Sequence, residues 1–333
     1  MAKTKHLRWG LLSTARINRA LIEPLRTSKY SILSAVASRS LEKADVFAKT
    51  WEIPHYHSSY EALLADSEIE VIYNCLPNSM HAEWSIKAMQ SGKHVLCEKP
   101  LTTSIREMDE VISLSRKTGM VITEAFMYRH HPQTLLVKQL VDQGDIGNLQ
   151  LIHGSFCYTK TRSNDVRFDP ALGGGSLWDV GCYPISFARY ITGKEPLEVY
   201  GHQVTGPTGV DLLYAGQLVF PGGVISQFEC SFITPFKATM EITGDKGRII
   251  ISEPYKPGIR TKLILERDGQ TQTISIRGAK LYHGEVEDIE NAILHGKPQR
   301  ISHEDSKANI AVIEALHRSV SLSKPIRLSE IGS

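Results

Sequence analysis

Long apolar runs and an excess of charge of one sign are both missing from this sequence of 333 residues. No stretch reaches the roughly eighteen apolar residues of a membrane-spanning helix, and the first residues, MAKTKHLRWGLLS, lack the apolar core of a signal peptide. The 38 basic and 36 acidic residues leave a net charge of only +2. We therefore expect a cytoplasmic protein that binds no nucleic acid and no membrane.

Cysteine is scarce, and its spacing excludes two kinds of site. The five cysteines lie at positions 75, 97, 157, 182 and 230, and no CxxC pair occurs. An odd number of scattered cysteines argues against a disulfide framework and against a structural zinc site. We expect reduced, mostly buried thiols and no bound metal. The hydrophobic content of 41% is that of a globular protein with sizeable cores.

What the first part of the chain does contain is a regular alternation of apolar runs and segments with helical spacing. The strand-like runs are LRWGLLS, SILSAVASRS, IEVIYNCLP, HVLCEKP and MVITEAF. The segments between them are INRALIEPLRT, LEKADVFAKTWE, a short helix within HYHSSYEALLAD, SMHAEWSIKAMQSGK and SIREMDEVISLSRKTG. This alternation predicts an α/β fold with a doubly wound parallel sheet, whose ligand lies at the carboxyl ends of the strands.

The pattern changes near residues 124–129. A helix in QTLLVKQLVDQGDIG is followed by strand-like runs separated by Gly, Pro and Asp: LQLIHGSFCYTK, EVYGHQV, LYAGQLVF, GVISQFECSF, ATMEITG, GRIIISE, TKLILER and QTISI. Two amphipathic helices come last, GEVEDIENAILHG and EDSKANIAVIEALHRSVSLS. We expect hairpins and an antiparallel sheet in this second part.

The glycine fingerprint of dinucleotide-binding folds is absent after the first strand. The turn reads Ser13, Thr14, Ala15, Arg16, Ile17, and Gly10 lies inside the strand. Serine and alanine are small, so the backbone could still approach a pyrophosphate, and a helix starting near Ile17 could direct its N–H groups at it. The turn therefore predicts dinucleotide binding, with an α/β sheet for another ligand as the alternative.

The end of the second strand indicates which dinucleotide. Ser38 and Arg39 stand where an acidic residue would hold the ribose of NAD, and Lys43 follows one helical turn later. A serine and an arginine suit the 2′-phosphate of NADP. We expect NADP, with NAD possible, and the alternative is a solvated arginine on a loop.

Two later strand ends carry further candidates. The segment after the third long apolar run would cross the nicotinamide side of the cofactor, and its candidate contacts are Cys75, Leu76, Pro77, Asn78 and His81. His81 could instead serve its own helix structurally. In the next strand end, Glu98 and Lys99 precede Pro100, which restricts Lys99 to extended geometry at the crevice. Burial and nearby cations would lower the pKa of this lysine, and Glu98 would raise it.

The segment GGGSLWDVGCYP, residues 173–184, places Asp179 and Tyr183 four positions apart after three glycines. On a helix this spacing puts both side chains on one face. The glycines would let the backbone approach a cofactor and a sugar. The alternative is a turn into an ordinary helix with a buried tyrosine.

Together these segments resemble the glucose–fructose oxidoreductase / inositol dehydrogenase (Gfo/Idh/MocA) family over nearly the whole chain. The segments that carry the resemblance, in order and spacing, are WGLLSTARI, VASRS, NCLPNSMHAEWSIKAMQSGKHVLCEKPLT, TEAFMYRHHPQ and GGGSLWDVGCYPI. The resemblance implies an NAD(P)-binding Rossmann domain, residues 1–125. It also implies an α+β domain with a large, mostly antiparallel open sheet, residues 126–333. Members commonly form homodimers or homotetramers through that sheet.

The resemblance also implies roles for individual residues. Lys99 matches the lysine of the family's Glu-Lys-Pro motif, near the reacting oxygen and the nicotinamide ribose. Asp179 matches the aspartate of its later glycine-rich motif. Tyr183 stands where many members carry a catalytic histidine. In carrying a tyrosine here, the chain resembles the branch of the family that includes dihydrodiol dehydrogenase, NADP-dependent xylose dehydrogenases, glucose–fructose oxidoreductase and some nucleotide-sugar ketoreductases. That branch also has residues like Ser13 and Ala15 in place of the turn glycines.

The activity implied is hydride transfer between NADP and a secondary alcohol, hemiacetal or ketone of a sugar or related polyol. Tyr183 would be the acid/base; because a free phenol has a pKa of about 10, Lys99 would have to lower it. Asp179 would orient the substrate. The remaining expected contacts are Arg129 for the cofactor and Arg162, Arg167 and Trp178 for the substrate. Alternatives are a trans-dihydrodiol dehydrogenase, a nucleotide-sugar ketoreductase, or a sensor that binds NADP without turnover.

Overall fold

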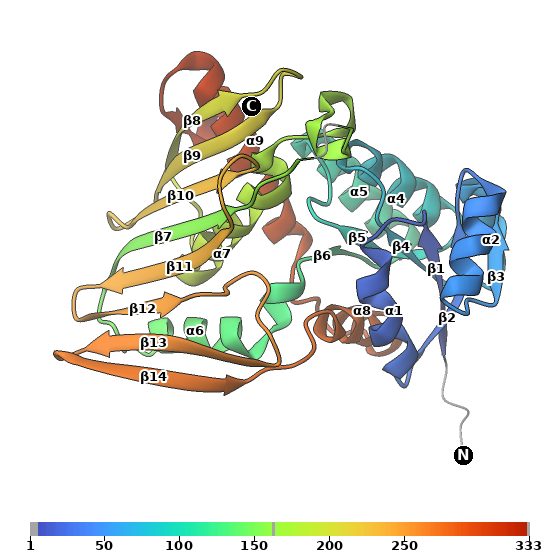
Figure 1. The fold of residues 1–333 in the computed structure, drawn as a ribbon, viewed down its shortest axis with the longest axis horizontal. Coiled ribbons are helices and arrows are strands. Elements are labelled where there is room, and N and C mark those ends of the chain that lie inside the picture. Colours follow the sequence, from blue (N-terminus) through green and yellow to red (C-terminus); the bar gives the residue numbers. More distant parts are fainter. Residues whose placement is uncertain (1–5, 162–163, 332–333) are drawn as a thin grey trace. The chain divides into compact units, whose positions relative to one another are not determined.

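The computed structural model describes residues 6–161 and 164–331 and divides into two compact units (Figure 1). The first unit comprises Met1–Met127 and Tyr282–Ser306, and the second comprises Tyr128–Leu281 and Lys307–Ser333. The expected division assigned every residue after 125 to the second domain. Helix α8, His283–His295, instead belongs to the first unit, where it packs against α1 and β6.

The first unit is built on a six-stranded parallel sheet, with strand order β3-β2-β1-β4-β5-β6. Its strands are β1 Leu7–Leu12, β2 Ser31–Ala37, β3 His55–His57, β4 Val71–Asn74, β5 His94–Glu98 and β6 Ile122–Ala125. Its remaining long helices are α1 Asn18–Thr27, α2 Leu41–Thr50, α3 Tyr60–Ala65, α4 His81–Gln90 and α5 Ile105–Thr118. The doubly wound α/β fold is confirmed, and the edge strand β3 adds to the expected elements.

Strand order reverses between β1 and β4, and this reversal positions the candidate residues. The chain leaves β1 toward one edge of the sheet and leaves β4 toward the other. In folds of this kind, ligands bind outside the carboxyl ends of the two strands at such a reversal. Residues 13–17 follow β1, and residues 75–81 follow β4. The sequence therefore places both segments at the topological switch point.

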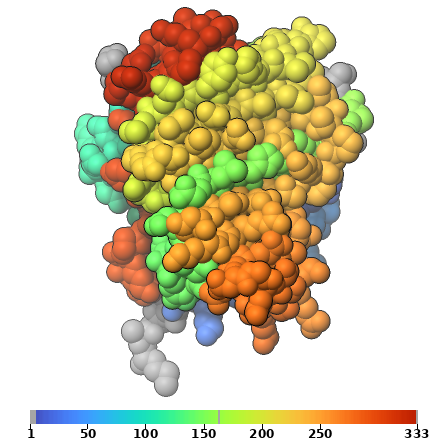
Figure 2. Space-filling model, turned by 90° about the vertical axis from the view of Figure 1, so that its left-hand side faces the viewer, coloured from blue at the N-terminus to red at the C-terminus, as the bar shows by residue number. Residues whose placement is uncertain are grey.

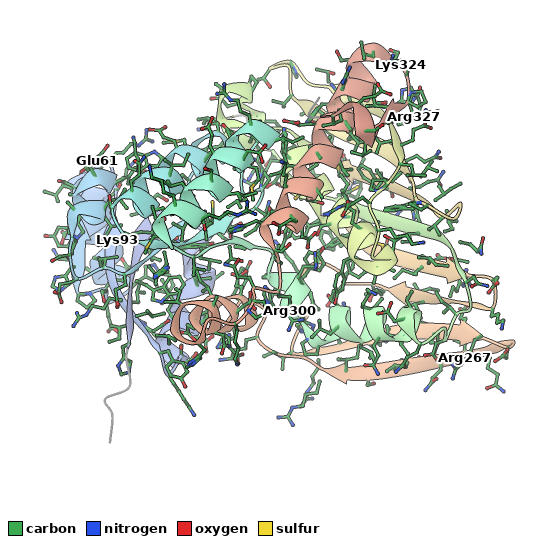
Figure 3. The ribbon with its side chains drawn as sticks, turned by 180° about the vertical axis from the view of Figure 1, so that it is seen from behind. Glu61, Lys93, Arg267, Arg300, Lys324 and Arg327 are labelled. Atoms are coloured by element: carbon green, nitrogen blue, oxygen red, sulfur yellow. The ribbon has the colours of Figure 1, made fainter. Side chains whose placement is uncertain are left out.

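Side-chain caps define where the elements of this unit begin and end. Ser104 precedes α5 and accepts a hydrogen bond from the N–H of Glu107 at 3.2 Å, and Gly119 ends the helix with φ of 70°. Lys93 is buried before β5, and its ammonium donates to the carbonyls of Asp66 and Ile69 at 2.6 Å each (Figure 3). Burial lowers the pKa of Lys93. The two hydrogen bonds of Lys93 fix the turns that precede β4 and β5.

The second unit is built on a nine-stranded sheet, ordered β14-β13-β12-β11-β7-β10-β9-β8-β15. Its strands are β7 Leu149–Cys157, β8 Glu198–Thr205, β9 Asp211–Val219, β10 Ile225–Ser231, β11 Lys237–Gly244, β12 Gly247–Ile251, β13 Arg260–Arg267, β14 Gln270–Arg277 and β15 Ile326–Arg327. Figure 2 shows these strands as neighbouring bands of yellow, green and orange. β7 and β10 pair in parallel and the other neighbours pair antiparallel, so the expected mostly antiparallel sheet is confirmed.

Three long helices complete the second unit: α6 Pro132–Asp142, α7 Cys182–Thr192 and α9 His303–Leu322, whose first residues belong to the first unit. α7 packs on β7, and α6 packs on β13 and β14. Within the described part of the chain, no helix is long and apolar enough to cross a membrane.

Candidate active site

The turn after β1 keeps the shape of a nucleotide-binding turn without its glycine. Ser13 adopts φ of +81°, a left-handed conformation that glycine usually supplies. Its hydroxyl accepts a hydrogen bond from the N–H of Ala15 at 3.1 Å, and its carbonyl accepts one from the side chain of Asn18 at 2.7 Å. No side chain caps the start of α1 at Ile17. An anion such as a pyrophosphate fits this helix start.

Two buried side chains, those of Cys75 and Asn18, stabilise that turn. Cys75 donates its thiol to the carbonyl of Leu12 at 2.9 Å and to the side chain of Asn18 at 3.0 Å. Burial raises the pKa of Cys75 to about 12, so the thiol stays protonated as a donor. The expectation that Cys75 touches the cofactor therefore concerns its backbone, because its side chain supports the turn. The sequence analysis did not identify Asn18 as a residue of the site, although an asparagine directly after a tight turn commonly stabilises that turn by a hydrogen bond.

The end of β2 presents the residues expected for NADP. Ser38 is buried and accepts a hydrogen bond from the N–H of Ser40 at 3.3 Å, while Arg39 and Lys43 are exposed. Arg39 also interacts with the hydroxyl of Tyr60. The two cations therefore stand beside the carboxyl end of β2, in the position the sequence analysis gave them.

His81 joins the chain segments that leave β4 and β5. Its Nδ1 lies 2.7 Å from the carbonyl oxygen of Pro100, and its Nε2 lies 2.7 Å from that of Leu76. The ring is 1% exposed, and burial lowers its pKa to about 4, so it is neutral at physiological pH. A neutral imidazole carries one N–H, so it donates to one of these two carbonyl oxygens, and its other nitrogen only lies near the second. These contacts fit the structural alternative considered for His81. Leu76 is buried, and Pro77 and Asn78 are half-buried beside it.

Glu98 and Lys99 are half-buried at the carboxyl end of β5. Glu98 accepts a hydrogen bond from the hydroxyl of Tyr73 on β4, with an O···O distance of 2.6 Å. The Lys99–Pro100 peptide bond is cis. The side chain of Glu98 thus bridges two neighbouring strand ends immediately before Lys99.

In the second unit, Asp179 lies in a network of charged and phenolic groups. Its Oδ2 accepts hydrogen bonds from Nε of Arg167 at 2.7 Å and from the hydroxyl of Tyr158 at 2.9 Å. Arg167 also pairs with Asp165 at 3.0 Å. The charge of Asp179 raises the pKa of Arg167, and burial together with Asp179 raises that of Tyr158. The structure brings together Asp179 and Arg167, as well as Tyr158, which no sequence signal singled out.

The glycines before Asp179 are explained by close packing within the second unit. Gly175 has φ of +117°, and a Cβ there would lie 2.3 Å from Oδ1 of Asp211. A Cβ on Gly174 would lie 2.6 Å from the carbonyl oxygen of Arg167. The sequence analysis attributed these glycines to the approach of ligands. The structure provides a packing reason that is sufficient by itself.

Asp211, at the start of β9, anchors the segment that carries Asp179. It is 3% exposed, and its Oδ2 accepts hydrogen bonds from the hydroxyl of Ser176 at 2.6 Å and the N–H of Leu177 at 2.7 Å. A π-helix, Leu177–Gly181, begins there and runs directly into α7. Asp211 is remote in sequence from this segment, so no local pattern predicts its part.

Tyr183 and Trp178 are both buried and lie beside aromatic rings of the second unit. Tyr183 is 4% exposed, and its ring centroid lies 5.3 Å from Phe156, 5.6 Å from Tyr255 and 5.8 Å from Tyr128. Trp178 is buried, and its ring lies 5.6 Å from that of His317. This contact fits the packing alternative, and substrate contact by Trp178 stays a prediction.

Two arginines complete the predicted set. Arg129 is buried in the second unit, where its guanidinium lies 4.1 Å from the ring centroid of Tyr190 and donates to Ser186 at 3.4 Å. Its expected contact with the cofactor stays a prediction. Arg162 lies outside the described residues. Lys99 belongs to the first unit, and Asp179 and Tyr183 belong to the second.

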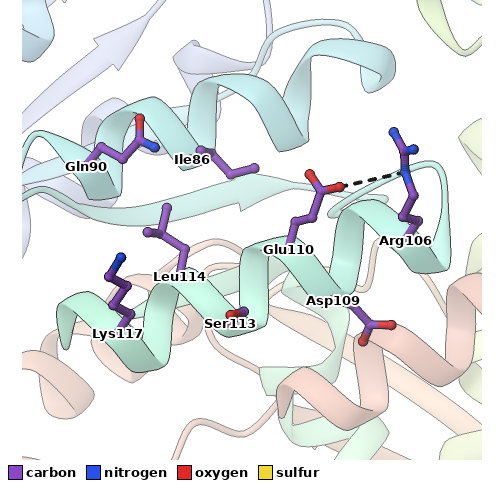
Figure 4. Close-up of a pocket in the computed structure, with 8 residues that line it drawn as sticks. All are labelled: Ile86, Gln90, Arg106, Asp109, Glu110, Ser113, Leu114 and Lys117. Atoms are coloured by element: carbon purple, nitrogen blue, oxygen red, sulfur yellow. Dashed lines mark ion pairs between the residues drawn. The ribbon is translucent and has the colours of Figure 1, made fainter.

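The surface of the described residues has two further hollows, and the second includes Asp165, the partner of Arg167. One, of about 580 Å³, runs between α4 and α5 and is lined by Ile86, Gln90, Arg106, Asp109, Glu110, Ser113, Leu114 and Lys117 (Figure 4). The other, of about 310 Å³, is lined by residues of the 164–172 segment and Thr208. Neither contains Lys99 or Tyr183. Among the described residues, no group of three or more His, Cys, Asp or Glu is arranged to hold a metal.

The chain is similar to several known proteins. The D-xylose 1-dehydrogenase (NADP+) 2 of Haloferax volcanii is 34% identical over 96% of this chain and 99% of its own. The trans-1,2-dihydrobenzene-1,2-diol dehydrogenase of Bos taurus is 31% identical over 74% of this chain and 75% of its own. A 3-ketoreductase from Actinomadura kijaniata, solved with NADP and TDP-benzene, superposes with a TM-score of 0.90 and 26% identity over 95% of this chain and 98% of its own.

Family models cover both parts of the chain. Residues 7–126 match the oxidoreductase family with an NAD-binding Rossmann fold, and residues 134–250 match the GFO/IDH/MocA C-terminal domain. The resemblance stated from the sequence is therefore confirmed. The chain belongs to the Gfo/Idh/MocA family of oxidoreductases.

Proposed function

We propose that this protein transfers hydride between NADP and a secondary alcohol, hemiacetal or ketone of a sugar or related polyol. The observation that carries the proposal is the left-handed turn at Ser13, followed by an uncapped helix and by the exposed cations Arg39 and Lys43. These groups fit a pyrophosphate and a 2′-phosphate respectively. NADP stands in the names of the xylose dehydrogenase and the ketoreductase structure to which the chain is similar.

When bound, the nicotinamide supplies the hydride chemistry, and the protein has to bind the substrate and move one proton. Tyr183 takes that proton from the substrate hydroxyl in oxidation and returns it to the carbonyl oxygen in reduction. Lys99 favours the phenolate, because a nearby ammonium lowers the pKa of a phenol. Both roles rest on the match to the family's motifs at these two positions.

Asp179 acts through its neighbours in this proposal. Its Oδ2 already accepts from Arg167 and Tyr158. A carboxylate held by an arginine and a phenol is oriented and charged, so it can hold a substrate hydroxyl or maintain the network that does. Arg167 is 35% exposed through its side chain and is the member best placed to meet a solvent-borne ligand.

We also propose that the protein forms a homodimer or homotetramer through the nine-stranded sheet. Helices cover one face of this sheet, and apolar side chains are exposed around it, with Leu151 at 39%, Val204 at 49% and Phe236 at 73%. Sedimentation equilibrium tests this point, and a monomer at micromolar concentration would exclude it.

The test of function is a turnover panel followed at the absorbance of reduced nicotinamide. The panel contains aldoses, cyclitols, trans-dihydrodiols and nucleotide-linked ketosugars, each with NADP and with NAD. We expect turnover with NADP and at least one sugar or polyol, lost about a hundredfold or more in Tyr183→Phe and Lys99→Ala, since general acid–base catalysis contributes about that much. Tyr200→Phe, on β8, is the control and should keep full activity.

Each alternative has its own outcome in this panel. Exclusive turnover of trans-dihydrodiols or of nucleotide-linked ketosugars would assign the activity of the corresponding relatives. Tight NADP binding without turnover of any compound would identify a sensor. Full activity in both Tyr183→Phe and Lys99→Ala would refute the roles given to these residues.

A further inference from the structure

A buried acid in the first unit has no role in the arrangement described so far. Glu285 lies in the first turn of α8 and is 1% exposed. Neither of its carboxyl oxygens has a hydrogen-bond partner among the described residues. An ionised carboxylate in this environment would lose its hydration without compensation, which costs far more free energy than binding a proton.

The helix that carries Glu285 packs into the apolar core of the first unit. Val286 and Ile289, on the same helix, pack in one core cluster with Tyr73 and Cys75 of the β4 strand and its end. Tyr282, just before α8, packs against the same cluster. The cluster therefore extends from α8 to the strand ends at which the candidate residues lie.

The negative charge of Glu98 acts on every ionisable group of this cluster. Burial first, and then Glu98, raises the pKa of Glu285 well above its usual range. The same two causes, in the same order, raise the pKa values of Tyr73 and Tyr282, and burial and Glu98 are among the causes that raise the pKa of Cys75. The negative charge of Glu98 therefore favours the protonated forms of Glu285, Tyr73, Tyr282 and Cys75.

Protonated acids need acceptors: Cys75 has the carbonyl of Leu12 and the side chain of Asn18, and Tyr73 has Glu98. Tyr73 donates its hydroxyl to Oε1 of Glu98 at 2.6 Å. A neutral Glu285 has one O–H to donate and accepts no hydrogen bond from the described residues. When two carboxyl groups lie in one low-dielectric environment, they retain a proton between them because both cannot ionise.

We propose that Glu285 is a positioning residue of the active site proposed above: as a neutral carboxylic acid it shares one proton with Glu98 through a buried water. The inference rests on the proposed function only in assigning Lys99 to the site. Tyr73 and Glu285 together fix the direction of the Glu98 carboxylate. Glu98 immediately precedes Lys99, so Tyr73 and Glu285 determine, through Glu98, the charge and the backbone position next to that lysine.

Infrared spectroscopy tests the shared proton without any assay of turnover. We expect a protonated-carboxyl C=O band at pH 7 in the wild type, absent from Glu285→Gln and retained in Glu287→Gln. Glu287 is the matched control because it is exposed on the same helix. In Glu98→Gln the band should disappear at a lower pH than in the wild type, since the charge that opposes ionisation of Glu285 is gone.

Two spectroscopic outcomes would overturn the proposal. If wild type and Glu285→Gln show no difference in this band, Glu285 is ionised and shares no proton. If Glu98→Gln leaves the band and its pH dependence unchanged, burial alone keeps Glu285 neutral and Glu98 is not its partner.

Kinetics test the positioning role. Glu285→Gln keeps a donor toward Glu98 and should retain kcat/KM within about threefold. Glu285→Leu removes the donor and should lower kcat/KM about tenfold, the loss typical of one hydrogen bond to a charged group. Equal activity of both variants and the wild type would refute the positioning role. Absence of turnover in the wild type itself would instead refute the proposed function, and the infrared result would still decide whether the proton is shared.

Discussion

Replacing Asp211 by alanine should loosen the segment that carries Asp179 and Tyr183. The buried carboxylate accepts one hydrogen bond from the Ser176 hydroxyl at 2.6 Å and one from the Leu177 N–H at 2.7 Å. Hydrogen bonds to charged acceptors contribute about 1.5–3 kcal/mol each. Loss of both should therefore destabilise the start of the π-helix by about 3 kcal/mol or more, because the two donors would stay buried without an acceptor.

Hydrogen exchange followed by mass spectrometry measures this effect locally. In Asp211→Ala, the amides of residues 176–180 should exchange about a hundredfold faster, as about 3 kcal/mol of lost protection requires. Peptides of the first unit should be unchanged. Asp142→Ala removes an exposed carboxylate at the end of α6 and serves as the control. Unchanged exchange of residues 176–180 would refute the anchoring role of Asp211.

Gly175 provides an independent check of the same contact. A methyl group at this position would lie 2.3 Å from Oδ1 of Asp211 and would also require φ of +117°. Gly175→Ala should therefore be destabilising, and the double variant with Asp211→Ala should be less destabilised than the sum of the two single changes, since the clash is gone. Strict additivity would show that the glycine is not required by Asp211.

The other predictions concern cofactor choice and acid stability. Arg39→Asp should shift the ratio of kcat/KM values for NADP and NAD at least tenfold toward NAD, because a carboxylate repels a 2′-phosphate and accepts from a ribose hydroxyl; Arg19→Asp, on exposed α1 surface, should not shift it. The pKa of His81 is lowered from 6.5 to about 4, so its contribution to stability is complete above about pH 6.5 and is lost as the pH falls toward 4. The free energy of unfolding, measured with urea between these pH values, should depend less on pH in His81→Gln than in the wild type, by up to about 3 kcal/mol across the range. An equal pH dependence of the unfolding free energy in both proteins would contradict the assignment.

The sequence predicted those features that depend on short-range pattern. Alternating apolar runs and amphipathic segments determine the parallel sheet, because each strand must be buried on both faces and each helix on one. The end of β1 predicted the position of the nucleotide turn. The left-handed conformation of Ser13 could not be predicted, because it is stabilised by contacts with Asn18 and Cys75.

Features that depend on contacts between distant segments could not be predicted. The amphipathic pattern of α8 predicts a helix, but its apolar face would suit either core, so the pattern does not show that Val286 and Ile289 complete the first unit. Likewise, Tyr158 directly follows β7 and Asp211 begins β9, and their partners lie elsewhere in the chain. The role of Lys99 and Tyr183 came from the resemblance and remains a proposal.

The return of α8 to the first unit has a consequence for how the protein is made on the ribosome. The core of the first unit contains Val286 and Ile289, and Glu290 accepts hydrogen bonds from Ser28 and Ser31. These residues emerge only after all of the nine-stranded sheet except β15 has been synthesised. The nucleotide-binding unit therefore cannot complete its folding first, although its strands are translated first. While most of the second unit is being synthesised, the first unit is incomplete and exposes part of its core. This exposed surface must be kept from aggregating until α8 has been made.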